Sequence, residues 1–466
     1  MTLWALAQHL IKKYINMNTR KLTRRQAIAT TSAGIAGMIL GFPVRSFGIN
    51  NTRQLKKLAI NGGEKIHTGP WPQWPYWDQS AEPGILEMLR SGRWWLGSGE
   101  HVTEFEKKYA ELMGAKRCLA TASGTTALLT ALNVLGVDAG DEVLVSPFTF
   151  IATYNVIFAS KALPVFVDSD PETFLIDPKK IEGRITDRTV AIVPVHIYGL
   201  PVDMDSVNKV SKDNGLKVIE DACQAWLAEY RGKRVGSIGD LGCFSFQNSK
   251  HLASGEGGAV LGNDEDLMDR CHAYHNCGRP FGRMKHVSGN QYNGMNYRMQ
   301  QSQALILMSQ MKRIEKDNDL RWANALYLNE KLKEIPGIIP SRAAEGATRA
   351  VYHMYPFRYV KEKFNNIPKD TFLRALNAEG IPCGGGYGKQ NKEGLIEEQL
   401  NSRGFKRLFP EARLKQWREE NNLPGNDLLC DQAVTFYQSM LLGSKADMDD
   451  IVNAITKLYE NRDSLI

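Results

Sequence analysis

The sequence predicts an α/β fold: a mainly parallel sheet with helices on both faces, followed by a smaller α+β C-terminal domain. Two observations support this. Helical stretches alternate with short apolar runs of strand length, which lie at 142–146, 164–167, 190–195, 217–220 and 243–246. This alternation stops near residue 310. We therefore expect a large domain over 58–310 and a small domain over 311–466.

The C-terminal region has a different pattern of elements. We expect a helix from 305 past 316, a strand at 350–360, and helices at 369–378 and 445–459. The span 386–428 is polar and has the character of an insertion. This mixture indicates α+β structure rather than a continuation of the parallel sheet.

Two reactive side chains come directly after two of the expected strands. Lys250 follows the run 243–246 and precedes the glycine-rich loop 253–258, while Asp221 ends the run 217–220. A lone lysine is usually solvated, and a lone aspartate is often a helix cap. As a pair they suit pyridoxal phosphate, because the lysine forms a Schiff base with its aldehyde and the carboxylate keeps its ring nitrogen protonated.

A phosphate site and an aromatic platform are also predicted. Small residues around Gly124 open the apolar helical run 128–135, and the free N–H groups at a helix start attract phosphate. An ordinary N-cap explains this segment equally well when it is taken alone. Phe150 follows the strand 142–146, at a position where a flat cofactor can stack, although most aromatic residues belong to the core.

These pieces resemble the DegT/DnrJ/EryC1/StrS sugar aminotransferases, which are fold-type I pyridoxal phosphate enzymes. The resemblance covers roughly 58–460, and the opening segments Leu58 to Gly63 and Trp71 to Pro75 are closest to the cyclitol (inosose) branch. The matching motifs occur in family order: Phe105-Glu106 with Gly114, Ser123 to Leu128, Pro147 to Phe150, Val195 to Gly199, Glu220 to Ala225, Phe244 to Gly258, and Gly294 to Met299.

The resemblance implies roles around the cofactor ring. Lys250 matches the Schiff-base lysine that also carries the proton during transfer. Asp221 matches the partner of the pyridine nitrogen, and Gln224 matches the side chain that hydrogen-bonds the ring hydroxyl. Phe150 matches the stacking aromatic. Cys223 is a departure, since relatives usually carry alanine there.

The resemblance also implies a set of phosphate ligands. Within the chain they are Gly124, Thr125 and Ser245, with Thr126 as an addition. Asn296 matches a residue that reaches the phosphate of the neighbouring subunit. This implies a homodimer with shared active sites.

The activity implied is transfer of an amino group from an amino acid, glutamate or glutamine, to a keto-sugar or keto-cyclitol. A dehydratase on the same fold is one alternative, but relatives of that kind replace the lysine with histidine. A non-catalytic sensor would have lost Lys250 or Asp221. A nicotinamide enzyme needs G-x-G-x-x-G after a strand, and Gly255-Glu256-Gly257 has Val260 at the third glycine position.

Charge and cysteine content exclude other classes. Seven of the 58 basic residues lie in 1–48, a segment without acidic residues, so the remaining chain carries 51 basic and 51 acidic side chains. This balance predicts no nucleic-acid partner. The seven cysteines are scattered and suggest no disulfide framework. Cys271 and His275 share a helical face but lack the paired ligand clusters of a zinc site, so no metal is predicted.

The N-terminal 48 residues have the pattern of a twin-arginine export signal. Arg24-Arg25 precedes a mild apolar run at 27–40, and Ser46-Phe47-Gly48 has the spacing of a cleavage site. Met17 is an alternative start. We expect the twin-arginine machinery to export the protein to the periplasm or beyond, with 49–57 as a linker. If the signal does not function, the enzyme is cytoplasmic and has a basic tail.

Replacing both arginines of the signal with lysine, Arg24→Lys with Arg25→Lys, should keep the full-length protein in the cytoplasm, folded and yellow. The charge is unchanged, but the pair is recognised as an address. Cell fractionation with an antibody against the protein measures the outcome. Export at the wild-type level would contradict the twin-arginine interpretation and favour the cytoplasmic alternative.

Overall fold

The computed structural model describes residues 57–286, 288–290 and 293–465. The predicted export signal at 1–48 and the linker up to residue 56 lie outside these residues. None of the described helices is long and apolar enough to cross a bilayer. The division at residue 310 into a large and a small domain stays a prediction.

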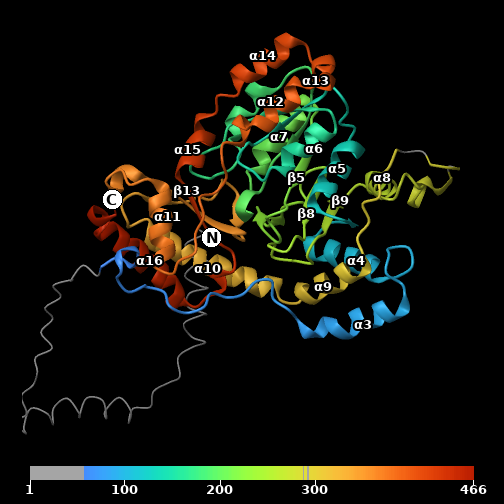
Figure 1. Ribbon diagram of the computed structural model, residues 1–466. Helices are drawn as coiled ribbons and strands as arrows, with labels where there is room; N and C mark the ends of the chain where they lie inside the picture. Colours follow the sequence, from blue (N-terminus) through green and yellow to red (C-terminus); the bar gives the residue numbers. More distant parts are fainter. Residues whose placement is uncertain (1–56, 287, 291–292, 466) are drawn as a thin grey trace, which may run out of the picture. The chain divides into compact units, whose positions relative to one another are not determined.

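A seven-stranded sheet forms the centre of the large region, in the order β1-β9-β8-β5-β4-β2-β3 (Figure 1). The pairs β2–β3, β2–β4, β4–β5 and β5–β8 are parallel. The five strands predicted from apolar runs are all present within two residues of their expected bounds: β2 (Glu142–Val145), β3 (Leu163–Phe166), β4 (Thr189–Val193), β5 (Lys217–Asp221) and β8 (Leu241–Ser245).

Two strands of this sheet were missed by the sequence analysis. They are β1 (Arg117–Thr121) and β9 (Gly258–Gly262), which pair antiparallel, and β9 also pairs antiparallel with β8. Strand β9 begins and ends with glycine, so in the sequence it resembles the glycine-rich loop that precedes it. Its strand conformation comes from hydrogen bonds to partners on both sides, which are distant in sequence.

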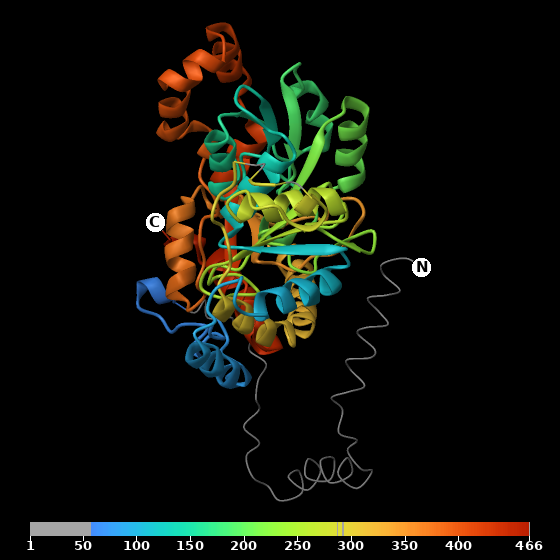
Figure 2. The ribbon, with the colours of Figure 1, turned by 90° about the vertical axis from the view of Figure 1, so that its right-hand side faces the viewer.

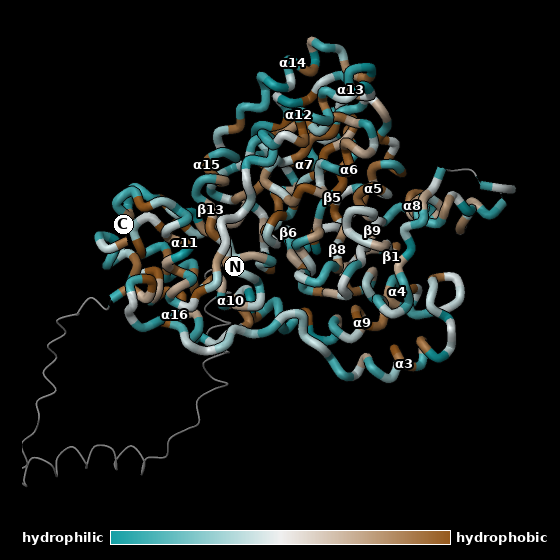
Figure 3. The backbone as a smooth tube through the Cα atoms, in the orientation of Figure 1, coloured by the Kyte–Doolittle hydropathy of each residue, from teal (hydrophilic) through white to brown (hydrophobic). Residues whose placement is uncertain are grey.

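Helices cover the sheet and bury its apolar side chains. They are α4 (His101–Met113), α5 (Gly124–Val134), α6 (Ala152–Ala159), α7 (Met204–Asn214) and α8 (Glu265–His275). Helix α5 packs across β8 and β9. Figure 3 shows hydrophobic residues concentrated in the central strands. On the α4 side, Tyr109 meets Phe244 and Phe246 edge-on, with ring centroids 5.6 and 5.4 Å apart. Such pairs add specificity to apolar burial.

The C-terminal region begins with two helices where one was expected. Helix α9 (Gln301–Met311) ends before α10 (Ile314–Leu332) starts, with Lys312 and Arg313 between them. A second sheet joins β10 (Ile338–Pro340), β12 (Met354–Tyr359) and β13 (Ala433–Tyr437) in antiparallel order. Helices α11 (Lys369–Ala378) and α16 (Lys445–Glu460) lie where predicted. A small third sheet contains β6 (Glu229–Tyr230), β7 (Lys233–Arg234) and β11 (Ala347–Arg349).

The polar span 386–428 is largely helical. Its helices are α12 (Gly394–Asn401), α13 (Arg403–Leu408), α14 (Glu411–Glu420) and α15 (Pro424–Gln432). Figures 1 and 2 show α12 to α14 grouped at one end, away from α11 and α16. The Arg413 guanidinium pairs with the buried Glu142 carboxylate of β2 at 2.6 and 3.0 Å. This bidentate pair joins the span to the edge of the central sheet.

The segment 58–75, here called the N-terminal strap, runs back over the C-terminal region before α3 (Glu82–Ser91) begins. Glu379, which is fully buried, accepts hydrogen bonds from the backbone N–H groups of Ala59 and Ile66 at 2.8 and 3.2 Å. The Lys457 ammonium donates to the same carboxylate at 2.9 Å. One buried ion pair therefore holds the strap in place.

Glu379→Gln should destabilise the protein by about 3 kcal/mol, because the buried Lys457 ammonium loses its counter-charge. Chemical denaturation followed by fluorescence measures the change. The double variant Glu379→Gln with Lys457→Met should recover part of the loss, since no buried charge is left unpaired. A single variant as stable as wild type would mean that the pair does not anchor the strap.

Candidate active site

The residues singled out in the sequence gather at the carboxyl edge of the parallel strands. Asp221 is the last residue of β5, and Lys250 follows the end of β8 by five residues. Phe150 lies between β2 and α6, and Gly124 is the first residue of α5. Ligands of open α/β sheets bind at this edge, because the connections to the helices diverge there.

Asp221 is buried, with 5% of its surface exposed. Its Oδ2 accepts a hydrogen bond from the Thr153 hydroxyl at 2.8 Å, and its Oδ1 accepts one from the Cys223 N–H at 3.1 Å. Each carboxylate oxygen therefore has one donor from the protein.

Lys250 lies in a turn that three contacts shape. Its N–H donates to the Gln247 carbonyl at 2.8 Å, and its carbonyl accepts from the Trp74 indole of the N-terminal strap at 2.9 Å. Its ammonium is 5.9 Å from the centroid of the Trp226 ring. Burial lowers the pKa of Lys250, and the nearby Cys223 and Asp221 oppose that shift. A lowered pKa increases the fraction of free amine, which is the nucleophilic form.

The start of α5 and the end of β8 lie in direct contact. A Cβ atom on Gly124 would come within 2.8 Å of the Ser245 Cβ and 2.9 Å of the Cys223 Sγ, so only glycine permits this approach. A Cβ on Gly258 would lie 2.3 Å from the Ser123 carbonyl. The N–H groups of Gly124 and Thr125 have no acceptor within the helix and are available to a phosphate, while the Thr126 N–H donates to the Ser123 hydroxyl at 3.1 Å.

The two threonines of this turn differ in what their side chains do. Thr125 is exposed at the first turn of α5. Thr126 has its hydroxyl committed to the helix cap, where it accepts from the Ser123 N–H at 2.9 Å and lies 2.8 Å from the Ser123 carbonyl. The N-cap that the sequence predicts is therefore present, and the phosphate site at the same turn stays a prediction.

Gln224 is held from two sides. Its Oε1 accepts from the Tyr198 N–H and its Nε2 donates to the Tyr387 hydroxyl, both at 2.9 Å. Tyr387 stacks on the Tyr198 ring at 5.5 Å with planes 8° apart. Burial raises the pKa of Tyr387 to about 12, which keeps its hydroxyl protonated.

Thr153 and Tyr387 contact predicted site residues and were not identified from the sequence. The run Gly384-Gly385-Gly386 before Tyr387 is a turn signal that could have drawn attention to this segment. For Thr153, the only signal in the sequence was its position three residues after Phe150.

The side chains of Phe150 and Asn296 remain outside this network of hydrogen bonds. Phe150 has 56% of its surface exposed, which leaves a ring face open. Asn296 is also exposed, in a segment beside the start of α5, where the Ala122 N–H donates to the Tyr297 carbonyl at 2.7 Å. Whether Asn296 serves its own subunit or a neighbour stays a prediction.

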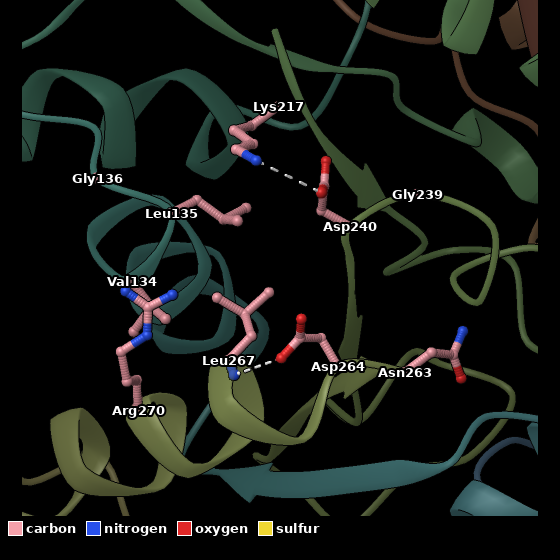
Figure 4. A pocket seen from close by; sticks show the side chains of 10 residues that line it. All are labelled: Val134, Leu135, Gly136, Lys217, Gly239, Asp240, Asn263, Asp264, Leu267 and Arg270. Carbon is pink, nitrogen blue, oxygen red and sulfur yellow. Dashed lines mark hydrogen bonds and ion pairs between the residues drawn. The ribbon is translucent and has the colours of Figure 1, made fainter. Parts of the chain in front are cut away.

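One cavity lies away from this edge. It has a volume of about 520 Å³ and lies where β5 and β8 begin and β9 ends, at the opposite edge of the sheet from Lys250. Figure 4 shows its lining, with Lys217 facing Asp240 and Asp264 capping α8. Lys217 is paired with Asp240 and Asp264 caps α8, so these charged groups form no catalytic arrangement.

The residues at the carboxyl edge fit pyridoxal phosphate. Gly124 and Gly258 let the start of α5 approach β8 and β9 closely, Asp221 provides a buried carboxyl group, and Lys250 provides an amine of lowered pKa. When bound, the cofactor supplies an aldehyde that takes up amino groups and a ring that accepts electrons.

Comparison with known proteins agrees with this geometry. The model of the DegT/DnrJ/EryC1/StrS aminotransferase family matches residues 77–406. The chain belongs to this family. It is a pyridoxal phosphate-dependent aminotransferase of fold-type I, as the sequence motifs predicted.

Relatives match the aminotransferase over nearly their whole length. An L-glutamine:2-deoxy-scyllo-inosose aminotransferase of Streptoalloteichus tenebrarius is 35% identical over 421 residues, covering 88% of this chain and 99% of the relative. An enzyme of the same name from Streptomyces fradiae is 36% identical over 417 residues, covering 87% and 98%.

Solved structures show the same fold. A 3-amino-5-hydroxybenzoic acid synthase has a TM-score of 0.73 at 30% identity, covering 84% of this chain and 100% of its own. An aminotransferase from Psychrobacter cryohalolentis has a TM-score of 0.74 at 30% identity, covering 84% and 99%.

Proposed function

We propose that this aminotransferase moves an amino group from glutamine to a ketone on a cyclitol ring. The observation that carries the proposal is a lysine amine of lowered pKa beside a buried aspartate, in a chain whose relatives are named glutamine:inosose aminotransferases. The twin-arginine segment is consistent with it, because an exported enzyme works apart from the nucleotide sugars of the cytoplasm.

In this proposal each site residue has a separate task. Lys250 binds the cofactor aldehyde and, once released, moves a proton as a general acid and base. Asp221 holds a positive charge on the ring nitrogen. Gln224 hydrogen-bonds the ring hydroxyl, and Phe150 covers one face of the ring. Gly124, Thr125, Thr126 and Ser245 form the phosphate end.

A dimer with shared sites is part of the proposal. Exposed apolar side chains gather beside Asn296, namely Met295, Trp94 and Trp95. Trp95 pairs with Gln300 of the same segment, which places these residues on one surface. Grouped exposed apolar residues are typical of a protein interface. A second copy covering this surface could bring Asn296 to its neighbour's phosphate.

The holoenzyme should convert 2-deoxy-scyllo-inosose or scyllo-inosose to an amino-cyclitol when glutamine is the donor, as detected by mass spectrometry. Lys250→Ala should lower the rate at least about 100-fold, because the proton carrier is lost. Lys250→Arg should fail equally, since a guanidinium stays charged. Turnover of keto-sugars but of no keto-cyclitol would contradict the substrate class, and full activity of Lys250→Ala would contradict the role of the lysine.

Mixing two inactive variants tests whether sites are shared. If Asn296 serves the neighbour, Asn296→Ala should weaken cofactor binding while Lys250 stays reactive. Exchange of its subunits with Lys250→Ala subunits should restore activity, because each heterodimer then contains one site with both residues intact. If the subunits exchange and no activity returns, Asn296 acts within its own subunit.

A further inference from the structure

A chain of two buried hydroxyls leads to Asp221. Thr149 follows β2, and Thr153 stands in the first turn of α6. Their hydroxyl oxygens are 2.9 Å apart, and the Thr153 hydroxyl is 2.8 Å from Asp221 Oδ2. Thr149 and Thr153 are 0% and 1% exposed, so no solvent competes for these hydrogen bonds.

The direction of the hydrogen bonds in this chain follows from the chemistry of its end. An ionised carboxylate can only accept, so Thr153 donates its single proton to Asp221. The Thr153 oxygen then has only lone pairs to offer Thr149, so Thr149 donates to Thr153. Both hydroxyl dipoles point toward the carboxylate, and such chains strengthen one another in a buried setting.

Thr153 also holds the aromatic residue of the site. Its N–H donates to the Phe150 carbonyl at 3.0 Å. The backbone of Thr153 thus contacts Phe150 while its side chain contacts Asp221. The first turn of α6 therefore fixes the position of Phe150, the proposed stacking residue, relative to Asp221.

We propose that Thr153 is a positioning residue that orients Asp221 and keeps it ionised beside the cofactor ring nitrogen, with Thr149 in support. The inference rests on the proposed role of Asp221. The Cys223 N–H occupies Oδ1 at 3.1 Å, so loss of the Thr153 donor leaves the carboxylate held at one oxygen only. A carboxylate that turns or takes up a proton holds less positive charge on the ring.

Several titratable side chains interact electrostatically with Asp221, among them Lys250, Tyr387, Cys223 and Cys243. Burial raises the pKa of Tyr387 and of both thiols, which keeps these three neutral near pH 7. Lys250 is the only cation among the four, and it is needed for the reaction. The hydroxyl chain is therefore a source of stabilisation for Asp221 that does not depend on the state of the lysine.

The test compares Thr153→Val, which keeps the shape and removes the donor, with Thr153→Ser, which keeps the donor. Each holoenzyme is loaded with cofactor labelled with nitrogen-15 in the ring, and the ring-nitrogen resonance reports protonation. Thr153→Val should shift the resonance toward the neutral form and lower kcat about tenfold, as expected for loss of one hydrogen bond to a charged group. Thr153→Ser should stay within about threefold of wild type.

Two further variants separate the possible causes. Thr189→Val removes a buried hydroxyl that accepts from the Thr186 N–H at the far end of β4, and it should leave the resonance and kcat unchanged. Asp221→Asn should shift the resonance further than Thr153→Val does. If Asp221→Asn matches wild type in both readouts, the proposed role of Asp221 is wrong and the inference falls with it.

If Asp221→Asn is impaired and Thr153→Val behaves like wild type, the inference about Thr153 is wrong, whereas the proposed role of Asp221 stands. If Thr153→Val fails to fold, Thr149→Val replaces it, because that variant leaves the Thr153 donor in place and removes its support. In Thr149→Val, a smaller shift of the ring-nitrogen resonance in the same direction, with a rate loss of about threefold, would support the role of the two hydroxyls. An unchanged resonance would overturn it.

Discussion

The buried charge of Asp221 is the constraint around which the site is arranged. A carboxylate removed from water is unfavourable unless donors and a cation accompany it. Thr153 and the Cys223 N–H supply the donors, and Lys250 interacts with the same carboxylate. Burial also disfavours the charged form of Lys250, and this lowers its pKa and favours its neutral amine. The same burial therefore makes the Asp221 carboxylate dependent on its donors and makes Lys250 a better nucleophile.

Distant parts of the chain complete the site. The Trp74 indole of the N-terminal strap bonds the Lys250 carbonyl, and Tyr387 of the C-terminal region bonds Gln224. Because the Tyr198 N–H can only donate, the Gln224 oxygen faces it and the amide nitrogen faces Tyr387. The Glu379–Lys457 pair anchors the strap that carries Trp74, although the pair does not line the site.

Close packing explains the phosphate end. Helix α5 begins so near β8 that Gly124 has no room for a side chain between Ser245 and Cys223. The Cys223 sulfur adds to this crowding. The Ser123 hydroxyl caps the Thr126 N–H and the Thr126 hydroxyl caps the Ser123 N–H, while the N–H groups of Gly124 and Thr125 stay free.

Lys250, Asp221 and Gly124 could be located from the sequence because each lies just after a strand or at a helix start, where local pattern is strong. The five parallel strands were visible for the same reason: buried on both faces, they are continuously apolar. The sequence did not reveal strand β9, the break between α9 and α10, or the contacts of Thr153 and Tyr387. Strand β9 pairs with β1, and the side chains of Thr153 and Tyr387 meet Asp221 and Gln224, all of them far away in sequence. No local pattern records which hydroxyl meets which carboxylate once the chain has folded.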